Sequence, residues 1–147
     1  MNARAQARSA ARLAAVQALY QTAMEATPLA NLLDEFHRHR LGATIEEMEF
    51  IDAETAFFDD IVSGVVARGA EIDAQLSAKL ADGWRLERLD KTMLQILRAG
   101  AYELIARADI GVGTVINEYL DVTHAFFDAR EAKFVNGLLD AVAKDVR

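Results

Sequence analysis

The sequence predicts an all-α fold of six or seven helices arranged as two small packed bundles. Apolar residues recur every three or four positions along most of the 147-residue chain, which is the pattern of a helix with one buried face. The alternation typical of strands is scarce, and the chain has a single proline, Pro28. Apolar residues make up 52% of the chain, enough for a core. We therefore expect a single domain, residues 1–147, with helical halves at about 1–80 and 81–147.

The N-terminal half begins with a helix expected from about Arg4 to Met24. Pro28 begins a second helix, which Gly42 should end. Residues 46–60 hold seven acids and no base, so we expect a solvated loop and the first turn of the next helix, where acids suit the helix dipole. The apolar positions expected to face the core in the first helix are Leu13, Val16, Leu19, Tyr20 and Met24.

One long helix should follow the acidic segment, with Phe58, Ile61, Val62, Val65, Ile72 and Leu76 on a single face. Gly83 and Trp84 interrupt this pattern, and Asp90 is placed to cap the next helix. That helix carries Leu94, Leu97, Ala101, Leu104 and Ile105 at helical spacing.

Two further helices complete the C-terminal half. The segment IGVG at 110–113 predicts a turn, after which Thr114 can cap a helix. Asp128 and Glu131 are spaced like a capping box that opens the last helix. The apolar positions of these two helices are Val115, Tyr119, Val122 and Phe126, followed by Val135, Leu138, Leu139 and Val142.

Signals for catalysis or metal binding are weak. The absence of cysteine excludes disulfides, thiolate metal sites and cysteine nucleophiles. His37 and His39 are two residues apart, so on a helix they point to different faces and cannot share a metal. Glu118 and Asp121 could pair as carboxylates, but no nucleophile or cationic clamp accompanies them. We expect no enzymatic activity, no cofactor and no metal.

The first 24 residues are basic, although the whole chain has a formal net charge of −7. They contain Arg4, Arg8, Arg12 and no acid, so they sum to +3 and the remainder to −10. Residues four apart advance only about 40° around a helix, so these arginines form a stripe about 12 Å long. Guanidinium groups bind phosphates through paired hydrogen bonds, so one interpretation is a site for two or three phosphates of a single-stranded nucleic acid. The alternatives are a solvated helix face and, for Arg12, a side chain that covers the core.

A second candidate site opens the last helix. Lys133 and Phe134 lie in its first turn, and Phe134 is at the edge of the apolar stripe. One interpretation is a phenylalanine of the core. The other is a partly exposed ring on which a base stacks, beside a lysine for its phosphate.

Four segments together resemble the NusB family of bacterial transcription factors. They are AAVQALYQ near the N-terminus, ILRAGAYEL at 96–104, VINEYLDV at 115–122 and KFVNGLLD at 133–140. They occur in the order of the family and at about its spacing. The resemblance covers the first helix and nearly all of the C-terminal half.

The resemblance implies an all-helical fold of two bundles without catalysis. It implies a partner, the small-subunit ribosomal protein NusE, and a shared ligand, the boxA element of nascent RNA. The resulting assembly lets RNA polymerase pass terminators, chiefly on ribosomal RNA operons. The arginine-rich first helix of the family binds RNA, which points to Arg8 and Arg12 beside Arg4 of the stripe. The KFVNG motif assigns RNA contact to Lys133 and Phe134.

Two other functions compete with antitermination. NusB-like domains also form the N-terminal part of certain ribosomal RNA cytosine methyltransferases, which continue into a Rossmann-like domain with catalytic cysteines. This chain reaches Arg147 without a cysteine, so we expect it not to be such an enzyme. The third hypothesis is a helical protein-interaction module whose arginines are merely solvated. No apolar run approaches the length of a membrane span, and we expect a cytoplasmic protein.

Overall fold

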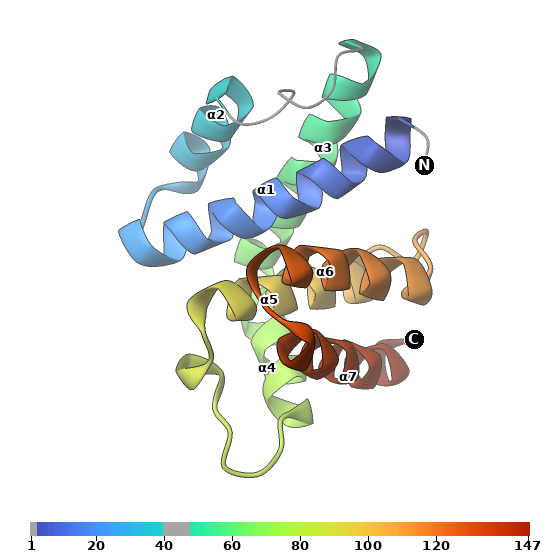
Figure 1. Ribbon diagram of the computed structural model, residues 1–147. Helices are drawn as coiled ribbons and strands as arrows, with labels where there is room; N and C mark the ends of the chain where they lie inside the picture. The colour runs from blue at the N-terminus through green and yellow to red at the C-terminus, as the bar shows by residue number, and fades with distance from the viewer. Residues whose placement is uncertain (1–2, 40–47) are drawn as a thin grey trace. The chain divides into compact units, whose positions relative to one another are not determined.

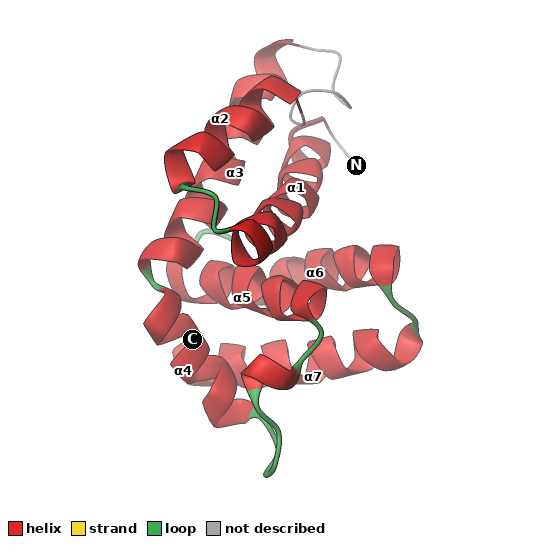
Figure 2. Ribbon diagram, turned by 90° about the vertical axis from the view of Figure 1, so that its left-hand side faces the viewer, coloured by secondary structure: helices red, strands yellow, loops and turns green. Residues whose placement is uncertain are grey.

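The computed structural model describes residues 3–39 and 48–147, and within these ranges it contains helices and connections but no strand (Figure 2). The all-α prediction is therefore confirmed. The helices, in chain order, are α1 (Ala3–Glu25), α2 (Leu29–His39), α3 (Met48–Ala67), α4 (Gly69–Lys79), α5 (Lys91–Ala106), α6 (Val112–Phe126) and α7 (Ala129–Val146) (Figure 1). A short 3₁₀ turn, η1 (Leu86–Arg88), precedes α5. The expected helix end at Gly42 lies outside the described residues.

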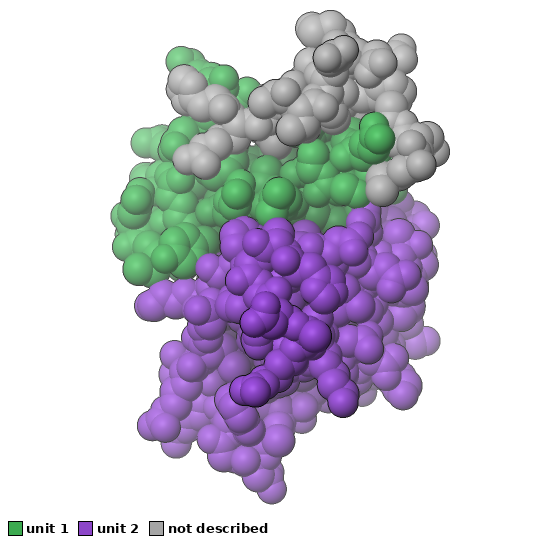
Figure 3. Space-filling view, in the orientation of Figure 1, with its two compact units in different colours: residues 1–64 green, residues 65–147 purple. Residues whose placement is uncertain are grey.

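The chain forms two compact units, residues 1–64 and 65–147 (Figure 3). The division falls inside the last turn of α3, earlier than the boundary near residue 80 that the sequence suggested. The physical reason is that α4 packs on α5 and α7, so it belongs with the C-terminal helices. Among the described residues, no helix combines the length and the apolar character needed to cross a membrane.

In the first unit, α1 buries a face made mainly of small side chains. The buried residues of this face include Ala7, Ala11, Ala14, Ala15, Val16, Ala18 and Leu19. Alanine favours helix formation and leaves room for close packing. Tyr20 and Met24, expected in the core, are 39% and 49% exposed. Periodicity indicates which face of a helix is buried, but not how far along the helix the covering elements extend.

The acidic segment is largely helical, because α3 begins at Met48. Glu54 is only 2% exposed, so the expected solvated loop and first helical turn do not describe this position. Phe36 of α2 stacks on Phe58 of α3 with ring centroids 5.3 Å apart. The next residue of each helix adds a polar contact, since His37 Nε2 lies 2.6 Å from Asp59 Oδ1.

The single long helix predicted after the acidic segment is in fact two helices. Arg68 separates α3 from α4, with φ −109° and ψ 23°, outside the α-helical region. Its guanidinium forms paired hydrogen bonds with Glu71, at 2.9 and 3.1 Å. Val65 and Ile72 are both buried and seven residues apart, so the apolar period continues across the break and could not reveal it.

In the second unit, α5, α6 and α7 each pack on the other two. Asp90 caps α5, accepting hydrogen bonds from the backbone N–H groups of Thr92 and Met93, and the capping box of Asp128 and Glu131 opens α7; both predictions are confirmed. The cap predicted at Thr114 was wrong, because α6 already begins at Val112 after Gly111.

Phe126, expected in the core, is 44% exposed. It is the last residue of α6, beyond the part of the helix that its neighbours cover.

The centre of this unit joins the three C-terminal sequence motifs. Tyr119 donates a hydrogen bond of 2.5 Å to Glu103 Oε2, and both residues are fully buried. At Gly100, an added Cβ would lie 2.9 Å from Leu139 Cδ1 and 3.4 Å from Tyr119 Cδ2. The glycine therefore lets α5 approach α6 and α7 closely.

Replacing Tyr119 by phenylalanine should lower the free energy of unfolding by about 1–3 kcal/mol, because Glu103 would lose a buried hydrogen-bond donor. Chemical denaturation followed by circular dichroism measures this change. Tyr20→Phe is the matched control, since Tyr20 is 39% exposed, and it should change stability little. Equal stability of the two variants would show that the bond to Glu103 contributes nothing.

Candidate nucleic-acid interface

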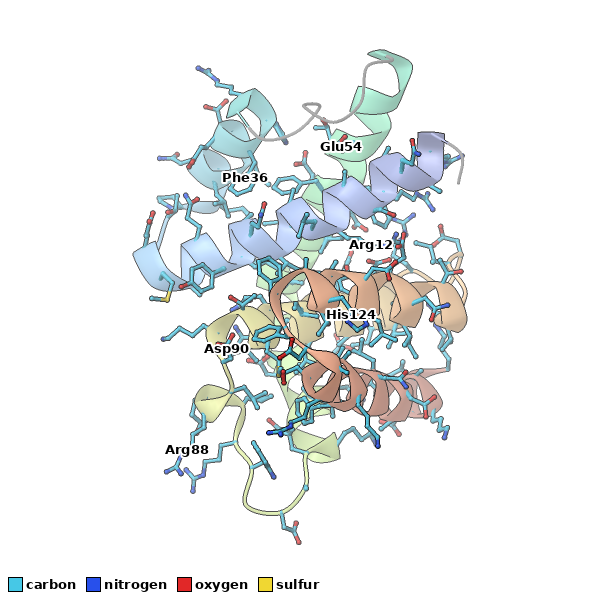
Figure 4. The ribbon with its side chains drawn as sticks, in the orientation of Figure 1. Arg12, Phe36, Glu54, Arg88, Asp90 and His124 are labelled. Atoms are coloured by element: carbon cyan, nitrogen blue, oxygen red, sulfur yellow. The ribbon has the colours of Figure 1, made fainter. Side chains whose placement is uncertain are left out.

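The three arginines of α1 have very different surroundings. Arg4 is exposed and Arg8 is partly buried. Arg12, which is labelled on α1 in Figure 4, is only 2% exposed. The Cζ atoms of Arg8 and Arg12 lie 4.9 and 4.8 Å from the ring centroid of Phe57 in α3. A guanidinium at this distance from a ring makes a favourable cation–π contact.

The structure does not place Arg12 on the surface with Arg4. Its burial against Phe57 favours the alternative in which Arg12 packs into its unit. Arg8 contacts the ring of Phe57 and is still partly accessible to solvent. Of these three arginines, Arg4 is the exposed one and Arg8 is partly accessible.

Lys133 and Phe134 are neighbours in the second turn of α7 rather than in its first, because the helix begins at Ala129. Lys133 is exposed and forms no ion pair with any other described residue. Phe134 is half-buried. This exposure is higher than that of a core residue and lower than that of a ring fully open for stacking. Its ring also lines a cavity of about 520 Å³ in the second unit. Part of the Phe134 side chain is thus buried while another part remains accessible.

Sequence reasoning missed Trp84 as a functional candidate and treated it only as part of a helix break. It is 58% exposed, and its ring centroid lies 6.3 Å from that of Phe134, with the planes at 34°. The available signal was that Trp84 is the single tryptophan of the chain and follows Gly83 in a loop, where a large aromatic residue has little reason to be unless it packs or binds.

The predicted site residues form two sets. Arg8 and Arg12 meet at Phe57 in the first unit, whereas Lys133 and Phe134 adjoin on α7 in the second. No group of three acids or histidines within the described ranges is arranged to hold a metal ion. The chemistry that both sets offer is binding, through cations for phosphate and through a ring for stacking.

Comparison with known proteins gives the class of this fold. The structure resembles T. maritima NusB, with a TM-score of 0.76 and 29% identity, covering 94% of this chain and 91% of that one. It also resembles a chain from the crystal structure of the antitermination factors NusB and NusE in complex with dsRNA. There the TM-score is 0.77 and the identity 25%, over 95% of this chain and 98% of that one. The fold is that of an all-helical transcription factor.

Sequence comparison identifies the family. The NusB family profile matches residues 9–144. The transcription antitermination protein NusB of Novosphingobium aromaticivorans is 74% identical over 141 residues, covering 96% of this chain and 95% of that protein. The Sphingopyxis alaskensis protein of the same name is 68% identical over 147 residues, covering 100% and 99%. This chain belongs to the NusB family.

Replacing Arg12 by alanine should lower the free energy of unfolding by about 2 kcal/mol or more, because a desolvated cation–π contact is lost. Thermal unfolding followed by circular dichroism measures the effect. Arg38→Ala is the control in the same unit: Arg38 is exposed and pairs with the exposed Asp34, so its loss should cost less than about 1 kcal/mol. Unchanged melting of Arg12→Ala, together with weakened RNA binding, would instead assign Arg12 to the RNA site.

Proposed function

We propose that this chain is a transcription antitermination factor that binds boxA-type single-stranded RNA together with NusE, a small-subunit ribosomal protein. Acting in the cytoplasm with the RNA polymerase antitermination complex, it promotes complete transcription of ribosomal RNA operons. The observation that carries this proposal is 74% identity, over nearly the whole chain, to a protein named for antitermination. The resemblance to a chain from the complex of NusB and NusE with dsRNA supports NusE and RNA as partners. The function is binding rather than catalysis.

The charge distribution supports a shared RNA site. The residues after position 24 sum to −10, which repels a polyanion. A second protein would add contacts to the same RNA, and linked contacts raise the overall affinity without strengthening either one. RNA binding by this chain alone should therefore be weak.

Each candidate residue has a distinct role in this proposal. Arg4 and Arg8 bind phosphates near the start of α1, and Lys133 binds a phosphate near the start of α7. These contacts position the RNA and carry no sequence information. Phe134 offers a ring for a base, a contact that is tolerant of base identity. Arg12 supports α1 from within the first unit.

The decisive measurement is a titration of single-stranded boxA RNA with the protein alone and with NusE present. We expect NusE to raise the affinity about tenfold or more. Tight binding at physiological salt without NusE would contradict this division of labour. No binding under either condition would remove RNA from the function.

The double substitution Arg4→Ala/Lys133→Ala tests the phosphate contacts within the same titration. Each lost contact should flatten the slope of log K against log salt by about 0.7, and affinity should fall for many sequences alike. Lys144→Ala is the control on α7, because Lys144 is exposed and paired with Asp140 at 3.0 Å. An unchanged slope in the double variant would leave these cations as solvated surface.

Phe134→Ala should weaken boxA binding by about 1–3 kcal/mol, the usual value of one base–ring stack. Because the ring is half-buried, the loss of stability should be smaller than the ~3–5 kcal/mol of a fully buried phenylalanine. A melting curve and an RNA titration give the two values, with the exposed Phe126→Ala as control. A large drop in melting temperature with RNA affinity preserved would assign Phe134 to the core alone.

A further inference from the structure

A cavity of about 520 Å³ lies within the second unit, beside the first turn of α7. Its apolar lining comes from Trp84, Leu89, Met93, Phe127 and Phe134. Pockets for small organic ligands are typically about 300–1,000 Å³ and combine such linings with a few polar groups. The size and the aromatic content suit a flat heterocycle.

The charged groups of the same cavity are not equivalent. Asp90 Oδ1 already accepts hydrogen bonds from Thr92 N and Met93 N, at 2.8 and 3.1 Å. Glu131 Oε1 accepts one from Asp128 N at 3.3 Å, within the capping box. Both carboxylates are therefore held by the ends of helices, where they offset the positive partial charge of the backbone amides.

The side chains of Arg88 and Arg130, the two arginines of the lining, make no comparable hydrogen bonds with other described residues. Both are exposed, and neither side chain forms an ion pair or hydrogen bond with another described residue. Figure 4 shows Arg88 on the connection that leads from α4 to α5. The charged side chains of the lining that form no such contact are thus the two positive arginines. They complement a ligand that carries an anionic group on a flat, apolar ring.

The backbone fixes the position of Trp84 in the lining of this cavity. Gly83 has φ +88°, a conformation that favours glycine, and Trp84 N donates to Ala81 O at 3.1 Å to close the turn. The indole lies next to Phe134 and is still 58% exposed. A large ring is thereby presented to solvent on a fixed turn.

We propose that this cavity receives an unpaired base of the bound single-stranded RNA, stacked on Trp84, while Arg88 and Arg130 bind phosphates that flank it. The inference rests on the proposed function and extends it to three residues that the sequence did not indicate. A nucleotide fits because it joins the two features found together, a flat ring and an anion. An apolar peptide side chain would leave both guanidinium groups without a partner.

Fluorescence gives a direct test, because Trp84 is the single tryptophan of this chain and lines the cavity. Titration with a single-stranded boxA oligoribonucleotide, with NusE present, should quench its emission. The same sequence as a duplex should leave the emission nearly unchanged, because paired bases are not free to stack. Equal emission with and without bound single strand would overturn the proposal.

Substitution gives the energetic test. Trp84→Ala should weaken RNA binding about 5- to 150-fold, the range of one base stack, and Trp84→Phe should restore most of it. Arg88→Ala/Arg130→Ala should flatten the salt slope by about 1.4, for two lost contacts. Arg85→Ala is the matched control, because Arg85 is an exposed arginine of the same loop that does not line the cavity.

The remaining outcomes separate this inference from the function on which it rests. If Arg4→Ala/Lys133→Ala weakens RNA binding while the cavity variants bind like Arg85→Ala, the base site is wrong and the RNA function stands. If Trp84→Ala weakens binding of NusE in the absence of RNA, the cavity is a protein-docking surface. If the wild-type protein with NusE binds no RNA, both proposals fail.

Discussion

The buried hydrogen bond from Tyr119 to Glu103, beside the close approach at Gly100, is the constraint on which the second unit depends. A carboxylate without exposure is tolerated only when its oxygens are hydrogen-bonded, so α5 and α6 must keep one register. At Gly100, contact with Leu139 and Tyr119 fixes how near α7 can come. These residues belong to the three C-terminal motifs. The motifs therefore contain the residues that pack α5, α6 and α7 against one another.

The candidate RNA groups of this unit follow from that crossing. Once α7 is fixed against α5 and α6, its capping box sets where the helix begins, and Lys133 and Phe134 take their places in the first turns. The turn at Gly83 then presents Trp84 beside Phe134. A rigid apolar core thus supports the exposed Trp84 beside the half-buried Phe134, and binding would need little reordering of these side chains.

The arginines of α1 show that one residue type can serve structure and binding within a single helix. Arg12 is buried against Phe57, Arg8 shares that ring, and Arg4 is exposed. A stripe of cations that is regular in sequence therefore passes from solvent into the interior as the helix winds. Fewer exposed cations at this surface agree with a protein that relies on a second RNA-binding partner.

The sequence by itself determined the helical class, the Asp90 cap, the capping box of α7 and the family, because these depend on local spacing and on motifs. The tertiary structure alone decided the rest. It separated α3 from α4 at Arg68. The sequence could not show this break, because the buried apolar residues keep their helical spacing on both sides of it. It buried Arg12 and Glu54, because polar residues enter a core only where a distant element supplies contacts. It also brought Trp84 to Phe134, fifty residues apart in the chain, which only the packing of the helices against one another can do.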